Sequence, residues 1–132
     1  DKYLSTRVRW GDNIQVVEHV GQGFVELVER GKTHGPEAEE VVETSIEPLL
    51  DAGADTIVLG CTHYPFLFET ISKVAASLAP DRTIHIVDPA PAVARHLHEI
   101  MTEKNIIRQD GYELNLYASG ENMALNNMVI TL

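Results

Sequence analysis

The sequence predicts an α/β domain with a mostly parallel sheet and helices on both faces. Short apolar runs rich in β-branched residues alternate with longer segments in which apolar residues recur at helical spacing. Gly and Pro residues separate these segments, as is typical of a chain that alternates strands and helices. We expect the domain to span residues 1–118 and to be followed by a tail, residues 119–132, whose pattern defines no structure.

The first third of the chain predicts a short strand and two helices. Residues 14–18, Ile-Gln-Val-Val-Glu, are the strand candidate, and residues 22–29 fit a short helix with Gly31 in the place of a C-terminal cap. Pro36 opens a longer helix, where acidic residues in the first turn suit the positive end of the helix dipole. We expect this helix to end at Gly53.

The middle of the chain predicts two strands of a parallel sheet. Residues 56–59, Thr-Ile-Val-Leu, suit a strand that is buried on both faces. Pro65 can start the helix that follows, and residues 83–87 predict the next strand. A further helix begins at Ala90, and the alternating residues 113–118 are typical of an edge strand.

Composition excludes several classes of function. The net charge of −10 argues against a nucleic-acid partner, because phosphate binding needs a basic face. No stretch approaches the ~20 apolar residues of a membrane span, and no secretory signal is visible. A single cysteine cannot form an internal disulfide, so we expect a cytoplasmic location. The chain begins with Asp1 rather than Met, and we expect it to be part of a longer product.

The candidate site is the loop of residues 60–65, Gly-Cys-Thr-His-Tyr-Pro. Ligands of open α/β sheets bind beyond the carboxyl ends of the strands, and Cys61 follows strand 56–59 at such an end. A helix N-terminus and a nearby imidazolium favour the thiolate form of a cysteine, and His63 is two residues away. The alternative is that Cys61 is a small buried apolar residue and His63 a surface histidine.

Residues 54–67 resemble the segment around the second catalytic cysteine of the glutamate racemase family. Residues 24–29 resemble the segment that precedes this motif, and residues 86–90 and 93–95 resemble the strand and helix that follow it. These matches fall in the right order over residues 23–95. The resemblance implies two α/β domains with the substrate between them, and no cofactor.

The resemblance also implies the roles of individual residues. In the family, two cysteines face opposite sides of the substrate α-carbon, because inversion needs a proton donor on the face opposite the base. Cys61 would be one acid/base, His63 would orient it, and Thr62 would help to hold the glutamate. Glu29 matches the acidic residue near this histidine, although Glu26 is close enough in sequence to be an alternative.

The chain departs from the family in having one cysteine where the mechanism needs two. The Gly-rich loop with its Asp-Ser pair and the first cysteine are absent, and we expect them on a missing N-terminal part of the same protein. This chain alone should therefore be inactive. An exposed cleft wall would favour self-association into a homo-oligomer. The resemblance further implies that the product, D-glutamate, supplies peptidoglycan.

Three other functions remain open from the sequence. The chain could be a related aspartate- or hydantoin-type racemase, or a non-catalytic binding domain of the same fold. A cysteine-nucleophile hydrolase is a third reading, but no third residue that orients a Cys-His pair is identifiable. No Cys/His spacing indicates zinc and no nucleotide-binding loop is present. Asp88 follows the second strand at the same sheet edge as Cys61, where it could reach the substrate cleft, but we expect it to cap the next helix.

Overall fold

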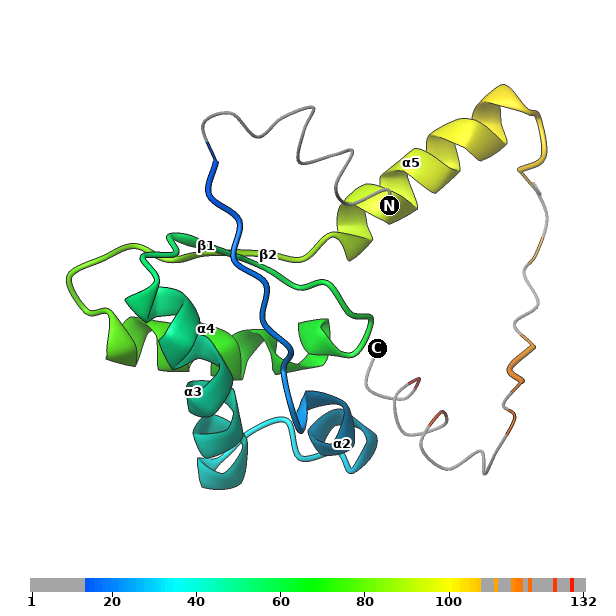
Figure 1. The fold of residues 1–132 in the computed structure, drawn as a ribbon. Coiled ribbons are helices and arrows are strands. Elements are labelled where there is room, and N and C mark those ends of the chain that lie inside the picture. Colours follow the sequence, from blue (N-terminus) through cyan, green and yellow to red (C-terminus); the bar gives the residue numbers. More distant parts are fainter. Residues whose placement is uncertain are drawn as a thin grey trace.

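The computed structural model describes residues 14–107, 111, 115–117, 119, 125 and 129. The elements in this part of the chain alternate between helix and strand, as the sequence predicts (Figure 1). They are, in order, α2 (Phe24–Glu29), α3 (Pro36–Asp51), β1 (Thr56–Val58), the 3₁₀ helix η1 (Tyr64–Leu67), α4 (Phe68–Leu78), β2 (His85–Val87) and α5 (Ala90–Glu103).

The strands β1 and β2 form a parallel pair, in which Ile57 lies opposite Ile86. Two backbone hydrogen bonds extend the pairing beyond the strand ends: His85 N–H donates to Asp55 O at 2.8 Å, and Leu59 N–H donates to Val87 O at 3.0 Å. Parallel neighbours need a crossover connection, and α4 supplies it. The α/β fold class with a parallel sheet is confirmed.

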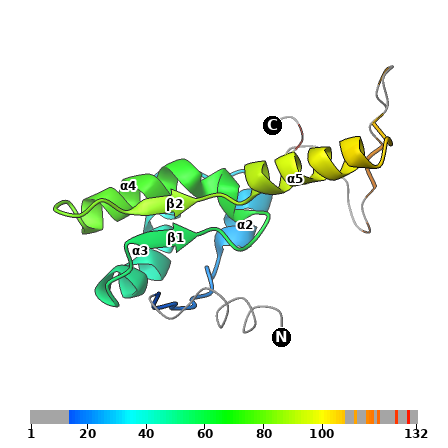
Figure 2. The ribbon, with the colours of Figure 1, turned by 90° about the horizontal axis from the view of Figure 1, so that it is seen from above.

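One face of the strand pair carries the hydrophobic core. Ile57 and Leu59 are buried together with apolar residues of α3 and α4, and these two helices lie on the same side of the strands (Figures 1 and 2). Side chains alternate along a strand, so Val58 and Val87 point to the other face, where they are 63% and 43% exposed. The prediction that strand 56–59 is buried on both faces is therefore wrong, and within the described residues helices cover one face only.

The contact between α3 and α4 is the centre of the core. Val42 on α3 and Ile71 on α4 have no exposed surface, and Leu67 of η1 is almost as deeply buried. Within α3 and within α4, the buried apolar residues recur at helical spacing, which gives each helix one apolar face. A buried leucine or isoleucine stabilises the fold by about 1.5–3 kcal/mol relative to its exposed state, so this contact fixes how the two helices lie under the strands.

Helix boundaries differ little from the prediction, but two predicted strands do not form as expected. Residues 14–20 contain no strand, and no strand in the described residues pairs with them. The second strand covers residues 85–87 rather than 83–87. The helix predicted from Pro65 begins as the 3₁₀ turn η1 before α4 continues it. Such 3₁₀ turns are common at helix N-termini.

The predicted edge strand and tail lie largely outside the described residues. Within the range 113–118, residues 115–117 are described and form no strand. Of residues 119–132, the structure describes 119, 125 and 129. The division of the chain at residue 118 stays a prediction.

Candidate active site

The loop that carries the cysteine lies where the sequence predicts it, at the carboxyl end of β1. The chain turns immediately after Cys61, because Tyr64 N–H donates to Cys61 O at 3.2 Å and Phe66 N–H donates to His63 O at 3.2 Å. These bonds start η1 and bring the side chains of the loop to the same end of the sheet. Cys61 is a free thiol of intermediate burial, so it is not sealed inside the core.

His63 lies between the thiol and a carboxylate. Its Nδ1 is 3.9 Å from Sγ of Cys61, and its Nε2 is 3.9 Å from Oε1 of Glu29. In the neutral imidazole one nitrogen accepts and the other donates, so a single tautomer can accept from the thiol and donate to Glu29. Both distances exceed those of tight hydrogen bonds, as is common in active sites without substrate.

The structure brings Glu29, and not Glu26, to His63. Glu29 is the last residue of α2, and its side chain is about half exposed while that of His63 is one-quarter exposed. Glu26 lies one turn earlier and is exposed. The family resemblance pointed to Glu29 or Glu26 as this acidic residue, whereas spacing alone identified no third group for a Cys-His pair, because Glu29 and His63 are 34 residues apart in sequence.

The remaining residues of the predicted site take simpler positions. Thr62 is exposed beside Cys61, so its hydroxyl is accessible from solvent. Asp88 follows β2 at the same edge of the sheet, and its Oδ1 accepts a hydrogen bond from Ala90 N–H at 2.9 Å. The predicted capping role of Asp88 is confirmed.

Sequence reasoning missed Tyr64. Its hydroxyl accepts a hydrogen bond from Gly21 N–H at 3.2 Å, and its ring meets that of Phe24 edge-on, with centroids 5.0 Å apart. Tyr64 therefore joins the cysteine loop to the start of α2. Its place beside His63 in the motif was the available signal, although the partners could not be known from spacing.

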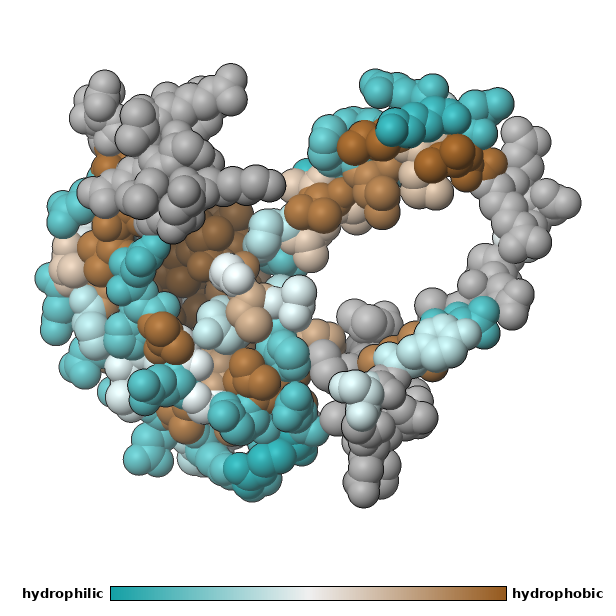
Figure 3. All heavy atoms as spheres, turned by 45° about the vertical axis from the view of Figure 1, so that its right-hand side comes forward, coloured by the Kyte–Doolittle hydropathy of each residue, from teal (hydrophilic) through white to brown (hydrophobic). Residues whose placement is uncertain are grey.

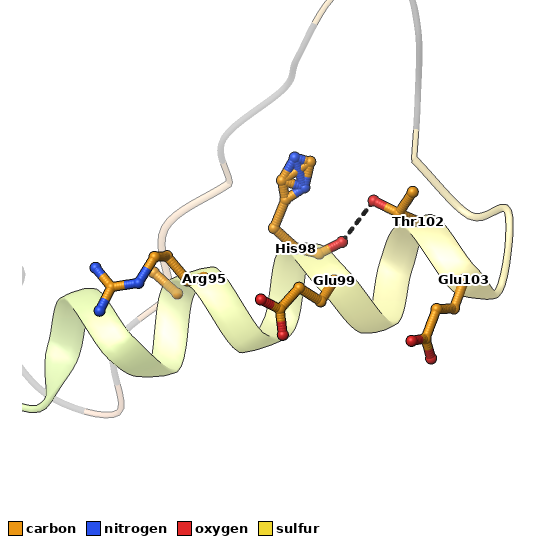
Figure 4. Close-up of a pocket in the computed structure, with 6 residues that line it drawn as sticks. Arg95, His98, Glu99, Thr102 and Glu103 are labelled. Atoms are coloured by element: carbon orange, nitrogen blue, oxygen red, sulfur yellow. Dashed lines mark hydrogen bonds between the residues drawn. The ribbon is translucent and has the colours of Figure 1, made fainter.

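Two hollows lie away from the cysteine. One, of about 680 Å³, is lined by α5 alone (Figure 4), and its residues are Ala94, Arg95, His98, Glu99, Thr102 and Glu103. Arg95, His98 and Glu99 point in different directions, so they do not converge on one point (Figure 4). The other, of about 310 Å³, lies between α4 and β2. Neither hollow supports a competing active site.

Among the described residues, no group of three or more His, Cys, Asp and Glu side chains is placed to hold a metal ion. No helix there is both long and apolar enough to cross a bilayer.

Comparison with known proteins decides the family. The family model described as Asp/Glu/Hydantoin racemase matches residues 7–97, which include the whole candidate site. The chain belongs to this racemase family. A glutamate racemase of Roseiflexus sp. is 43% identical over 100 residues, which cover 76% of this chain and 35% of that protein. A glutamate racemase of Ralstonia pickettii is 48% identical over 83 residues, which cover 63% of this chain and 28% of that protein.

Solved racemase structures share the fold. Glutamate racemase from Francisella tularensis, in complex with D-glutamate, matches with a TM-score of 0.69 and 24% identity over 83% of this chain and 38% of that one. An isoform from Bacillus anthracis matches with a TM-score of 0.66 and 28% identity over 83% of this chain and 39% of that one. The chain thus spans less than half the length of these racemases.

Proposed function

We propose that this chain is one part of a glutamate racemase and that Cys61 is one of its two proton-transfer groups. The observation that carries the proposal is the position of the His63 imidazole between Cys61 Sγ and Glu29 Oε1, 3.9 Å from each. The matched relatives are named glutamate racemases, and this supports L- and D-glutamate as the substrates. The reaction needs no cofactor in this proposal.

The proposed reaction removes the proton from the α-carbon of glutamate and returns a proton from the opposite face. The thiolate of Cys61 removes the α-proton, and the C–H electron pair stays on the α-carbon, from which it delocalises into the adjacent carboxylate. A second thiol on the opposite face then donates a proton and completes the inversion. His63 accepts the proton of the Cys61 thiol before the reaction, and Glu29 stabilises the imidazolium that results. Thr62, exposed beside Cys61, donates a hydrogen bond to the substrate.

The second thiol must come from another part of the racemase. The sequence has one cysteine, and its relatives have a chain roughly three times as long as the matched segment. We therefore propose that this chain alone does not racemise glutamate. In the cell, the complete enzyme would act in the cytoplasm and supply D-glutamate for peptidoglycan.

Loss of the thiol tests this proposal. Replacing Cys61→Ala in the complete racemase should lower the racemisation rate by at least about 10²–10⁴-fold, the usual contribution of a general acid or base. Circular dichroism of the purified enzyme with D-glutamate as substrate measures the rate. Ser77→Ala, an exposed change on α4, is the control and should leave the rate unchanged. Normal racemisation by the Cys61 variant would contradict the assignment.

The geometry also favours a second candidate, a cysteine hydrolase, because Cys61, His63 and Glu29 follow the order of a nucleophile, a base and an orienting acid. The two functions differ in what happens to the sulfur. A hydrolase forms a covalent acyl group on Cys61, which mass spectrometry detects after incubation with ester substrates. A racemase leaves the mass unchanged and exchanges the α-proton of glutamate with solvent. Aspartate and hydantoins, offered beside glutamate, distinguish the related racemases.

A further inference from the structure

The two contacts of His63 depend on how α2 lies against the cysteine loop. Cys61 belongs to the loop after β1, whereas Glu29 ends α2, and both lie 3.9 Å from the same imidazole. Both contacts are already longer than tight hydrogen bonds, so a shift of α2 away from the loop by about 1 Å would separate Glu29 from His63 altogether. The site therefore needs a structural link between the loop and α2.

Tyr64 provides that link. Its ring lies edge-on against Phe24, the first residue of α2, which is 3% exposed. Its hydroxyl accepts a hydrogen bond from Gly21 N–H. Among the described residues, this is the hydrogen bond that joins loop 60–67 to segment 21–29. Besides it, the two segments share the longer contact between His63 and Glu29 and apolar packing, which is less directional.

Gly21 shows that this arrangement is tightly packed. A Cβ atom at Gly21 would lie 2.7 Å from Cδ2 and 2.9 Å from Cγ of Phe24, distances that atoms in a folded protein do not adopt. The backbone of Gly21 therefore lies directly against the Phe24 ring, while its N–H donates to the Tyr64 hydroxyl. The φ angle of Gly21 is not positive, so its requirement for glycine is one of space.

We infer that Tyr64 is a positioning residue, whose hydroxyl and ring hold the cysteine loop against α2 so that His63 reaches Cys61 and Glu29 together. This inference rests on the proposed role of His63 as the partner of the Cys61 thiol. In this role, Tyr64 contacts neither the thiol nor the substrate and acts only through the position of His63.

The single thiol of the 132-residue chain allows a direct test. Alkylation by iodoacetamide, followed by mass spectrometry over a range of pH, reports the reactivity of Cys61 alone. Tyr64→Phe keeps the ring and removes the hydroxyl. We expect it to slow alkylation near neutral pH by about fivefold, the change that corresponds to loss of one hydrogen bond of ordinary strength. Tyr117→Phe, at an 87% exposed position, is the matched control and should change nothing.

A double-mutant cycle separates positioning from general loosening of the fold. If Tyr64 acts through His63, Tyr64→Phe should have no further effect in a His63→Gln background. An equal effect in both backgrounds, or wild-type alkylation by Tyr64→Phe itself, would overturn the inference. If His63→Gln alone leaves alkylation unchanged, the proposed role of His63 fails instead. Thermal unfolding of each variant shows whether the comparison is made between folded proteins. Tyr64→Phe is used because it keeps the aromatic ring and so disturbs the packing least.

Discussion

At the scale of residues, the candidate site consists of the His63 imidazole with the Cys61 thiol on one side and the Glu29 carboxylate on the other. The sequence predicted Cys61 and His63 because both belong to one short loop after a strand, where ligands of α/β sheets bind. It could not decide between Glu29 and Glu26, because the choice depends on how α2 lies against the loop. That contact joins residues far apart in sequence, and no spacing or periodicity encodes it.

The two glutamates of α2 form a matched pair for testing the carboxylate. Glu29→Gln should slow alkylation of Cys61 near neutral pH by about two- to fivefold, since an ion pair with a half-exposed carboxylate contributes up to about 1 kcal/mol. Glu26→Gln removes the same charge one turn earlier, on an exposed side chain away from His63, and should have little effect. Equal effects of both variants would mean that only the overall charge of α2 matters.

At the scale of elements, periodicity predicted the helices well and the strands less well. The apolar faces of α3 and α4 follow from helical spacing alone, and both are buried. Residues 14–18 carry the composition of a strand but have no strand partner in the described structure. A helix closes its hydrogen bonds within itself, whereas a strand needs a neighbour that the local sequence does not reveal.

The start of α3 depends on a glycine backbone. Gly35 precedes the helix with φ 91° and ψ 179°, a region that is essentially restricted to glycine. We expect Gly35→Ala to lower the free energy of unfolding by about 1–3 kcal/mol through backbone strain, because no atom lies within contact distance of the added methyl group. Gly60→Ala is the control, because Gly60 has open space and no positive φ. Urea denaturation compares the two, and equal losses would contradict the strain explanation.

The loop between α2 and α3 should make stability depend on pH. A hydrogen bond from Lys32, with Lys32 and Arg30 as nearby positive charges, holds the pKa of Glu37 below its ordinary value. A carboxylate with a lowered pKa stabilises the fold above the pKa of the unfolded chain, and this contribution is lost as pH falls through the lower folded value. Glu37→Gln should therefore reduce the fall in melting temperature between neutral and acidic pH. Glu43→Gln, on the same helix outside this cluster, should not, and a similar change in both would contradict the assignment.

At the scale of the whole molecule, the described chain leaves apolar surface in contact with water. Val93 and Leu97 of α5 are 64% and 55% exposed, and none of the residues of this helix is buried. Figure 3 shows its apolar side chains as a brown band along one side of the helix. The outer face of the strands is also exposed at Val58. The apolar residues of α5 recur at helical spacing and so share one side of the helix, but an amphipathic pattern does not say what covers that side.

The proposed reaction also belongs to the whole molecule, because inversion needs proton transfer on both faces of one carbon. Cys61 lies at the carboxyl edge of the sheet and can serve one face only. The family match includes this cysteine, and the relatives extend well beyond the matched segment. The opposing group is thus expected outside these 132 residues.

The most direct test of this claim is to measure whether hydrogen or deuterium occupies the α-carbon of each enantiomer after reaction in D₂O. The complete racemase is incubated with L-glutamate in D₂O, and proton NMR and mass spectrometry follow the α-position of both enantiomers during the first turnovers. We predict that newly formed D-glutamate carries deuterium while the remaining L-glutamate still carries hydrogen, and that Cys61→Ala abolishes this conversion. D-glutamate that retains the original hydrogen, or unchanged deuterium incorporation by the Cys61 variant, would contradict the assignment of Cys61 as one of two opposed proton-transfer groups.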